Sequence, residues 1–187
     1  IKLEMFSNVK CIACTTHASM LCDINGVLYT FGSNDFKQLG TTIYNKYDIN
    51  TINDLNIDVI TGGSFHLCCL TINKIGYSFG WNEHGQCGTK FNHSGSIAKP
   101  TKIEIDSMLN SIKNGRFHTI MKTINNEYYS CGNNLRLRCL IFNENNSMYV
   151  YQPTKINLKS IKKRIKNNNK IMGIIPGYSQ TFIMQRI

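Results

Sequence analysis

Hydrophobic and polar positions alternate along the chain in short runs. Runs rich in Ile, Leu, Val, Tyr, Phe and Thr are separated by Gly, Asn and Asp, which is typical of β-strands joined by tight turns. The pattern predicts strands near residues 9–14, 18–23, 27–32, 66–71, 76–80, 118–123, 128–132 and 181–185. We therefore expect an almost all-β chain.

The same order of residues recurs about every fifty positions. A histidine follows a glycine and precedes an apolar run, a turn and a second glycine. The recurring positions are His17, His66 and His118, then Gly63, Gly115 and Gly177, and Gly32, Gly80 and Gly132. Cys14 replaces the first of the leading glycines, and Gln180 replaces a fourth histidine. Closing runs at 100–105 and 153–158 predict a fourth strand per unit, so each unit would be one blade of a β-propeller.

Several short motifs accompany this repeat. They are Gly63-x-x-His66, Gly115-x-x-His118, Phe31-Gly32-Ser33-Asn34 with Gln38-Leu39-Gly40, and Phe79-Gly80-Trp81-Asn82 with Gly85-Gln86-Cys87-Gly88. Together they resemble the regulator of chromosome condensation repeat, a family of seven-bladed β-propellers. The third copy departs from it, with Leu137-Arg138-Cys139-Leu140 in place of the glycine-bounded turn. Kelch and WD-repeat propellers are the alternative architectures.

The resemblance implies an all-β β-propeller of four-stranded antiparallel blades, with about three complete blades and partial blades at both ends. Residues 1–187 would be part of one propeller domain. The repeat units are approximately 7–56, 57–105, 106–158 and a partial 171–187, and residues 159–170 form a basic inserted loop. Half a ring exposes strand edges, so more chain or a partner is expected to cover them.

The recurring residues suggest a structural role. One histidine per blade would be spread around a ring instead of converging on a metal ion, so we expect each to hydrogen-bond neighbouring backbone. The glycines lie between strands, where turn geometry explains them, and not before a helix that would cradle a phosphate. His84 and His93 fall in predicted loops and are expected to be solvated. We find no catalytic constellation and predict a protein that is not an enzyme, with no cofactor and no metal.

Eight cysteines are present, and we expect them to be reduced, buried thiols that act as small apolar residues. That use of cysteine favours a reducing intracellular compartment: the nucleus, the cytoplasm or an organellar matrix. No apolar run approaches the length of a membrane span, so no membrane partner is expected.

The net charge of +10 is concentrated in one half of the chain. Residues 1–100 hold seven basic and seven acidic side chains, whereas residues 101–187 hold fourteen against four. The candidate macromolecule-binding residues are Lys159, Lys162, Lys163, Arg164, Lys166 and Lys170, and Lys155 precedes them without any acid in between. Leu158, Ile161 and Ile165 have helical spacing, which indicates a short amphipathic helix. The alternative is composition drift in a genome rich in A and T, because Lys and Asn have A/T-rich codons.

Three functions fit these observations. The first is a non-catalytic interaction platform that binds protein or a nucleoprotein assembly. The second, implied by the resemblance, is guanine-nucleotide exchange on a Ran-like small GTPase coupled to chromatin binding. The third is a structural subunit of a ribonucleoprotein, including an organellar one, with nucleic acid bound through the basic second half.

Overall fold

The computed structural model describes residues 6, 8–42, 48–89, 95–142, 147–165 and 169–186. Within these ranges the chain forms fourteen β-strands, one α-helix and one 3-10 helix, η1 (Leu135–Leu137). All strand pairs are antiparallel. The fold is therefore built from local, consecutive pairing, as the short strands and tight turns predict.

Three four-stranded sheets and one two-stranded sheet follow one another along the chain. The first contains β1 (Val9–Cys14), β2 (Ala18–Asp23), β3 (Leu28–Gly32) and β4 (Asn50–Ile52). The second contains β5 (Ile57–Gly62), β6 (His66–Thr71), β7 (Gly76–Trp81) and β8 (Ser96–Lys102). The third contains β9 (Leu109–Asn114), β10 (His118–Thr123), β11 (Tyr128–Asn133) and β12 (Tyr149–Lys155). The last contains β13 (Ile171–Pro176) and β14 (Thr181–Gln185).

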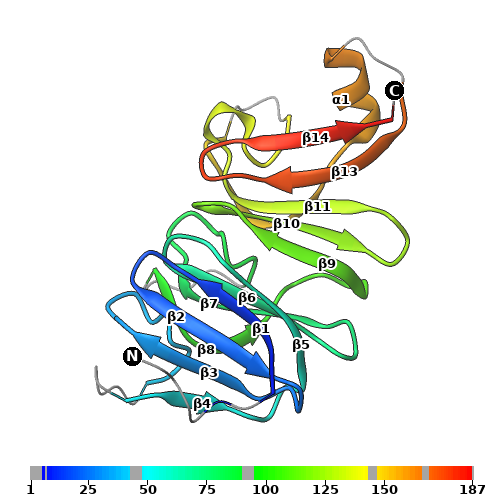
Figure 1. Ribbon diagram of the computed structural model, residues 1–187. Helices are drawn as coiled ribbons and strands as arrows, with labels where there is room; N and C mark the ends of the chain where they lie inside the picture. The colour runs from blue at the N-terminus through cyan, green and yellow to red at the C-terminus, as the bar shows by residue number, and fades with distance from the viewer. Residues whose placement is uncertain are drawn as a thin grey trace.

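The sheets are arranged side by side as the blades of part of a β-propeller (Figure 1). The first strands of neighbouring blades contact one another, β1 with β5, β5 with β9 and β9 with β13. A backbone N–H···O bond also joins each blade to the next at the turn between its first two strands. The donor–acceptor pairs are Thr16 to Ser64 at 2.9 Å, Ser64 to Arg116 at 3.0 Å and Arg116 to Tyr178 at 3.1 Å.

The apolar core lies between the sheets in three clusters. The cluster of Met20, Leu28, Ile57, Leu67 and Phe79 joins the first two blades. Leu70, Ile103, Leu109, Met121 and Cys131 join the second blade to the third. Ile120, Tyr128, Ile161 and Ile174 belong to the cluster between the third blade and the last. Each blade thus buries both faces only when a neighbour is present.

The eight strands expected from the sequence are confirmed to within one residue at each end. The closing strands are displaced: the structure has 96–102 and 149–155 where 100–105 and 153–158 were expected. The ladder ends before Ile103 and Ile156, which are 1% and 3% exposed and turn into the core. Pro100 and Pro153 lie where the outer strand bulges, a position at which a missing N–H is tolerated. The partial blade expected at the amino terminus lies outside the described residues.

A longer connection interrupts the repeat after the third blade. Fifteen residues (156–170) join β12 to β13, where six (103–108) join β8 to β9. The connection contains the helix α1 (Leu158–Arg164), which Asn157 caps by accepting bonds from the N–H groups of Lys159 and Ser160, both at 3.1 Å. None of the helices in the described part of the chain is long and apolar enough to cross a membrane.

Candidate interaction surfaces

Half of the expected basic loop is helical. Ile161 is 1% exposed and joins the core, so α1 is anchored to the propeller. Ile165 is 43% exposed and lies off the buried face, because the helix ends at that residue. The guanidinium of Arg164 stacks over the ring of Phe142, 4.2 Å from its centroid. The helical part of the inserted segment is therefore packed against the folded blades.

Four basic side chains of this connection are exposed. They are Lys159, Lys163, Arg164 and Lys170, which we call the basic connection. Lys162 is half-buried, and Lys166 lies outside the described residues. Within the described residues, no carboxylate lies within 4 Å of any member of the basic connection. Its charges are available to an acidic partner.

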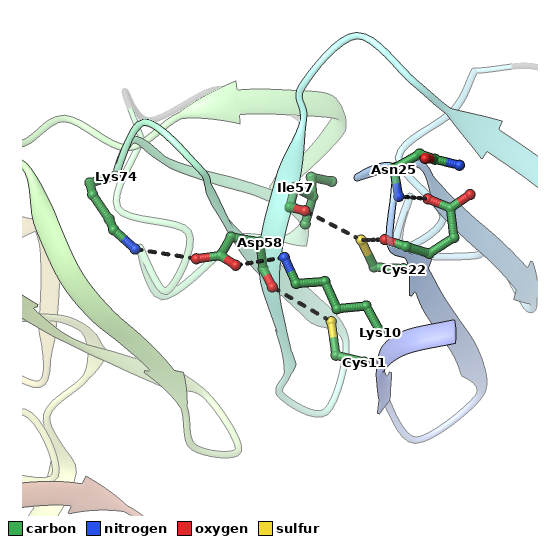
Figure 2. Close-up of polar contacts among 8 residues, drawn as sticks. Lys10, Cys11, Cys22, Asn25, Ile57, Asp58 and Lys74 are labelled. Atoms are coloured by element: carbon green, nitrogen blue, oxygen red, sulfur yellow. Dashed lines mark hydrogen bonds and ion pairs between the residues drawn. The ribbon is translucent and has the colours of Figure 1, made fainter. Parts of the chain in front are cut away.

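Three lysines elsewhere in the described residues form ion pairs. Figure 2 shows Lys10 and Lys74 approaching Asp58 at the junction of the first two blades, with Nζ–O distances of 2.7 and 3.2 Å. Hydrogen bonds from both lysines lower the pKa of Asp58 below its ordinary value. Lys155, which precedes the helix, pairs with Glu127. The contrast separates the basic connection from these three lysines.

Two of the three repeat histidines are fully buried and bond to the next blade. His66 Nε2 lies 3.0 Å from Thr119 Oγ1, and His118 Nε2 lies 3.0 Å from Thr181 Oγ1. Thr119 donates its own hydroxyl proton to the carbonyl of Gln86 at 2.7 Å, so its oxygen accepts from the imidazole N–H. Because each partner is a hydroxyl one blade away, the expectation of a neighbouring backbone partner is wrong for both histidines.

Burial keeps these two imidazoles neutral. Desolvation, with a smaller repulsion from His118, lowers the pKa of His66 to about 3. Desolvation, with repulsion from Arg138, lowers the pKa of His118 to about 4. The Nδ1 atoms of both rings are buried without a partner among the described residues. A histidine in this setting is a neutral hydrogen-bond donor between blades.

His17 occupies the same repeat position but is exposed and stacks on Phe65, with ring centroids 5.8 Å apart. The glycines explain this difference. A Cβ on Gly63 would lie 2.2 Å from His66 Cε1, and one on Gly115 would lie 2.1 Å from His118 Cε1. In the first blade that position is Cys14, whose side chain excludes the inward ring.

Glycine is required near the end of the third strand of each blade for a different reason. Gly32, Gly80 and Gly132 have φ of 113°, 99° and 109°. A Cβ on Gly80 would lie 2.4 Å from the carbonyl oxygen of Phe65. Strand packing requires glycine here. Gly177 is half-buried at the turn of the last blade.

The cysteines are all free. Six are buried, Cys11 is half-buried and Cys14 is exposed, so the expectation of buried thiols is wrong for Cys14. Burial raises the pKa of Cys22 to about 12. Within the described residues, no group of three or more His, Cys, Asp or Glu side chains is placed to hold a metal ion.

A row of aromatic side chains crosses the face that carries the turns between first and second strands. Its members, which we call the aromatic strip, are Phe36, Phe65, Trp81, His84, Phe117 and Tyr149. They come from three blades, and every one is half-buried. His84 was expected to be solvated but lies inside this strip, and burial lowers its pKa. His93 lies outside the described residues.

The rings of the strip interlock. Trp81 meets Phe117 edge-on at 5.1 Å and His84 edge-on at 4.7 Å, and His84 stacks on Tyr149 at 4.6 Å. Arg116 lies at one end with its guanidinium carbon 4.6 Å from the centroids of both Phe117 and Tyr178. Sequence reasoning missed this surface. Phe65 and Phe117 share a repeat position, which was the available signal.

The family model of the Regulator of chromosome condensation (RCC1) repeat matches residues 77–121, which run from the third strand of the second blade into the second strand of the third. Residues 77–121 therefore match one RCC1 repeat. Among curated relatives, the guanine nucleotide exchange factor SRM1 of Saccharomyces cerevisiae is 23% identical over 159 residues, covering 80% of this chain and 33% of SRM1. The ultraviolet-B receptor UVR8 of Arabidopsis thaliana is 26% identical over 125 residues, covering 65% and 28%.

Solved RCC1-type structures have the same fold. Prp20p of Saccharomyces cerevisiae superposes with a TM-score of 0.78 at 20% identity, covering all of this chain and 45% of Prp20p. Human WBSCR16 superposes with a TM-score of 0.78 at 17% identity, covering 95% and 44%. The chain thus spans a third or less of the curated relatives and under half of these structures.

Proposed function

We propose that this chain is a non-catalytic interaction platform, and that its basic connection binds the phosphates of a nucleoprotein partner. The observation behind the proposal is the set of four exposed cations in the connection that contains α1, none of which has a carboxylate within 4 Å among the described residues, while Lys10, Lys74 and Lys155 are neutralised by Asp58 or Glu127. The anchored helix carries three of these cations, Lys159, Lys163 and Arg164. Clustered cations on such an element favour contact with a phosphate backbone.

The test compares two triple variants with equal charge. One replaces Lys159, Lys163 and Arg164 with Gln. The control replaces Lys99, Lys102 and Lys113 with Gln, and these three lysines are exposed on β8 and β9. Binding to duplex DNA and to single-stranded RNA is measured over a range of salt concentrations. Removing one cation that touches a phosphate should reduce the log–log salt slope by about 1, so the first variant should lose about 3 for duplex DNA and the control little.

Two results would count against this proposal. Equal losses in both variants would mean that net charge alone drives binding. An unchanged affinity in the first variant would remove the basic connection as a site. Thermal unfolding of each variant verifies that the blades remain folded, because basic residues in the last turn of α1 also favour the helix.

Guanine-nucleotide exchange is the second candidate, and it is favoured by the similarity to SRM1. Prp20p, which has the same fold, binds Gsp1p and histones. An exchange factor must hold its GTPase against competing nucleotide, which requires a large preorganised surface. We expect residues 1–187 alone not to accelerate the release of labelled GDP from a Ran-like GTPase. Measurable acceleration would replace the non-catalytic proposal with exchange.

A further inference from the structure

The aromatic strip and Arg116 form a surface that the basic connection does not explain. We infer that this surface binds an extended peptide of a protein partner, with apolar side chains on the strip and a carboxylate on Arg116. The strip combines turns between first and second strands with the connections between third and fourth strands, whereas the basic connection joins a fourth strand to the next blade. The two surfaces therefore contact partners independently, and the proposal for one surface can be wrong while the proposal for the other is right.

Arg116 is preorganised to receive an anion. Its guanidinium is held between the rings of Phe117 and Tyr178, 4.6 Å from each centroid. Its Nε is buried without a hydrogen-bond partner among the described residues. A planar guanidinium fixed by stacking loses little freedom when it binds a carboxylate, and its fork matches the two carboxylate oxygens.

Arg138, on the neighbouring loop, is an arginine whose guanidinium has hydrogen-bond acceptors within the chain. Its Nε donates to the carbonyl of Ser179 at 2.9 Å, and one terminal nitrogen donates to Asn133 Oδ1 at 3.2 Å. The Nε of Arg116 has no such acceptor among the described residues, and its guanidinium is held by ring contacts instead. The difference indicates that the partner of Arg116 comes from another molecule.

The space beside Arg116 admits a peptide side chain. A hollow of about 400 Å³ opens there, lined by Thr15, Thr16, Ser64, Asn114, Arg116 and Tyr178. The amide Nδ2 of Asn114 already donates to the carbonyl of Thr61 at 3.3 Å. A carboxylate entering this hollow would therefore meet the guanidinium of Arg116 and hydroxyl groups of the lining. Tyr178, which is 65% exposed, forms the rim.

Interlocked rings distinguish a peptide from a single-stranded nucleic acid. Base stacking needs an open ring face. In the strip, Trp81 is packed edge-to-face with Phe36, Phe65, His84 and Phe117, so the rings cover one another. What remains exposed is a continuous apolar contact surface, of the kind that holds aliphatic or aromatic side chains at protein interfaces.

Trp81 is the single tryptophan of the chain and lies within the strip, so its fluorescence reports on this surface. The probe is a six-residue peptide of alternating Asp and Leu with blocked ends, and its matched control has Asn for every Asp. We expect the acidic peptide to shift Trp81 emission and the Asn peptide to bind at least tenfold more weakly. Equal responses to both peptides would overturn the inference.

Three variants locate the carboxylate. Arg116→Gln removes the guanidinium and should weaken the acidic peptide at least tenfold. Arg116→Lys retains the charge without the planar fork and should be intermediate, so the test holds even if Arg116→Gln folds poorly. Lys99→Gln changes the net charge equally on β8, outside both surfaces, and should leave the affinity unchanged. Equal weakening by Lys99→Gln would show nonspecific attraction and contradict the inference.

Two other occupants give different signals. The first is single-stranded nucleic acid, probed with an oligothymidine of ten nucleotides. A larger change in Trp81 emission with this oligonucleotide than with the acidic peptide would assign the strip to nucleic acid and overturn the peptide inference. A concentration-dependent change in Trp81 emission with matching dimer formation in sedimentation would assign it to a second copy of the chain, with the same consequence.

Discussion

The first blade and the two that follow it use the same repeat position in opposite ways. In the second and third blades the histidine is buried, neutral and bonded to a threonine of the next blade. In the first blade His17 is exposed and only stacks on Phe65. The residue is identical, so its neighbours must set its role.

Two neighbouring positions account for the difference. Three residues before the histidine, Gly63 or Gly115 leaves room for the ring, whereas Cys14 does not. The second position directly follows the repeat histidine of the next blade. For His66 this residue is Thr119, which supplies a hydroxyl, whereas for His17 it is Leu67, which has none. A recurring histidine therefore forms an inter-blade hydrogen bond only where a glycine lies three residues before it and a threonine lies at the facing position of the next blade.

Acidification should have the largest effect, because it acts on both buried histidines together. The pKa values are about 3 for His66 and about 4 for His118, against about 6.5 in an unfolded chain. Above pH 6.5 both states are neutral, and between pH 6.5 and 4 only the unfolded chain takes up protons. The free energy of unfolding should therefore fall by up to about 1.4 kcal/mol per pH unit for each histidine.

Urea unfolding at several pH values between 4.5 and 7 measures this slope. The ion pair of Asp58 loses stability in a lower range, as the pH falls toward the lowered pKa of its carboxyl. A flat profile between pH 5 and 6.5 would mean that His66 and His118 become protonated without unfolding.

Adding one methyl group should give the second-largest difference in stability loss between the first blade and the second. In Gly63→Ala the new Cβ would lie 2.2 Å from His66 Cε1 and 2.7 Å from the carbonyl oxygen of Gly115. The ring of His66 cannot move away without disturbing its bond to Thr119 in the next blade, so we expect a loss of about 3 kcal/mol in the free energy of unfolding. Cys14→Ala, at the same repeat position, should change it by under about 0.5 kcal/mol. Similar losses in the two variants would remove the glycine from the explanation.

The sequence predicted the blades well because each strand is specified by local alternation that recurs. It misplaced the closing strands, because Ile103 and Ile156 look like strand residues although their side chains enter the core beyond the ladder. Such a position is fixed by the neighbouring blade, which a local pattern does not contain.

The candidate surfaces were predicted less well. The positive charge of the connection after β12 was visible in the sequence, but its anchoring by Ile161 depends on tertiary packing. The aromatic strip combines a turn residue such as Phe65 with a strand end such as Trp81 and the first residue of β12, Tyr149. These positions are far apart in the repeat and meet only when the blades curve around one another, so no period in the sequence links them.

Removing one hydroxyl should give the smallest of the three losses. Thr119→Val conserves the shape of the side chain but leaves His66 Nε2 and the carbonyl of Gln86 without their partner. Leaving buried polar groups unpaired costs about 2 kcal/mol, more than the bond itself contributes. Thr16→Val, at an exposed threonine in the first blade, is the control and should change the free energy of unfolding by under about 0.5 kcal/mol. Chemical denaturation of both variants at pH 7 measures the difference. If Thr119→Val were as neutral as Thr16→Val, the histidine would be held by packing alone, and the first blade would differ from the others only by its missing glycine.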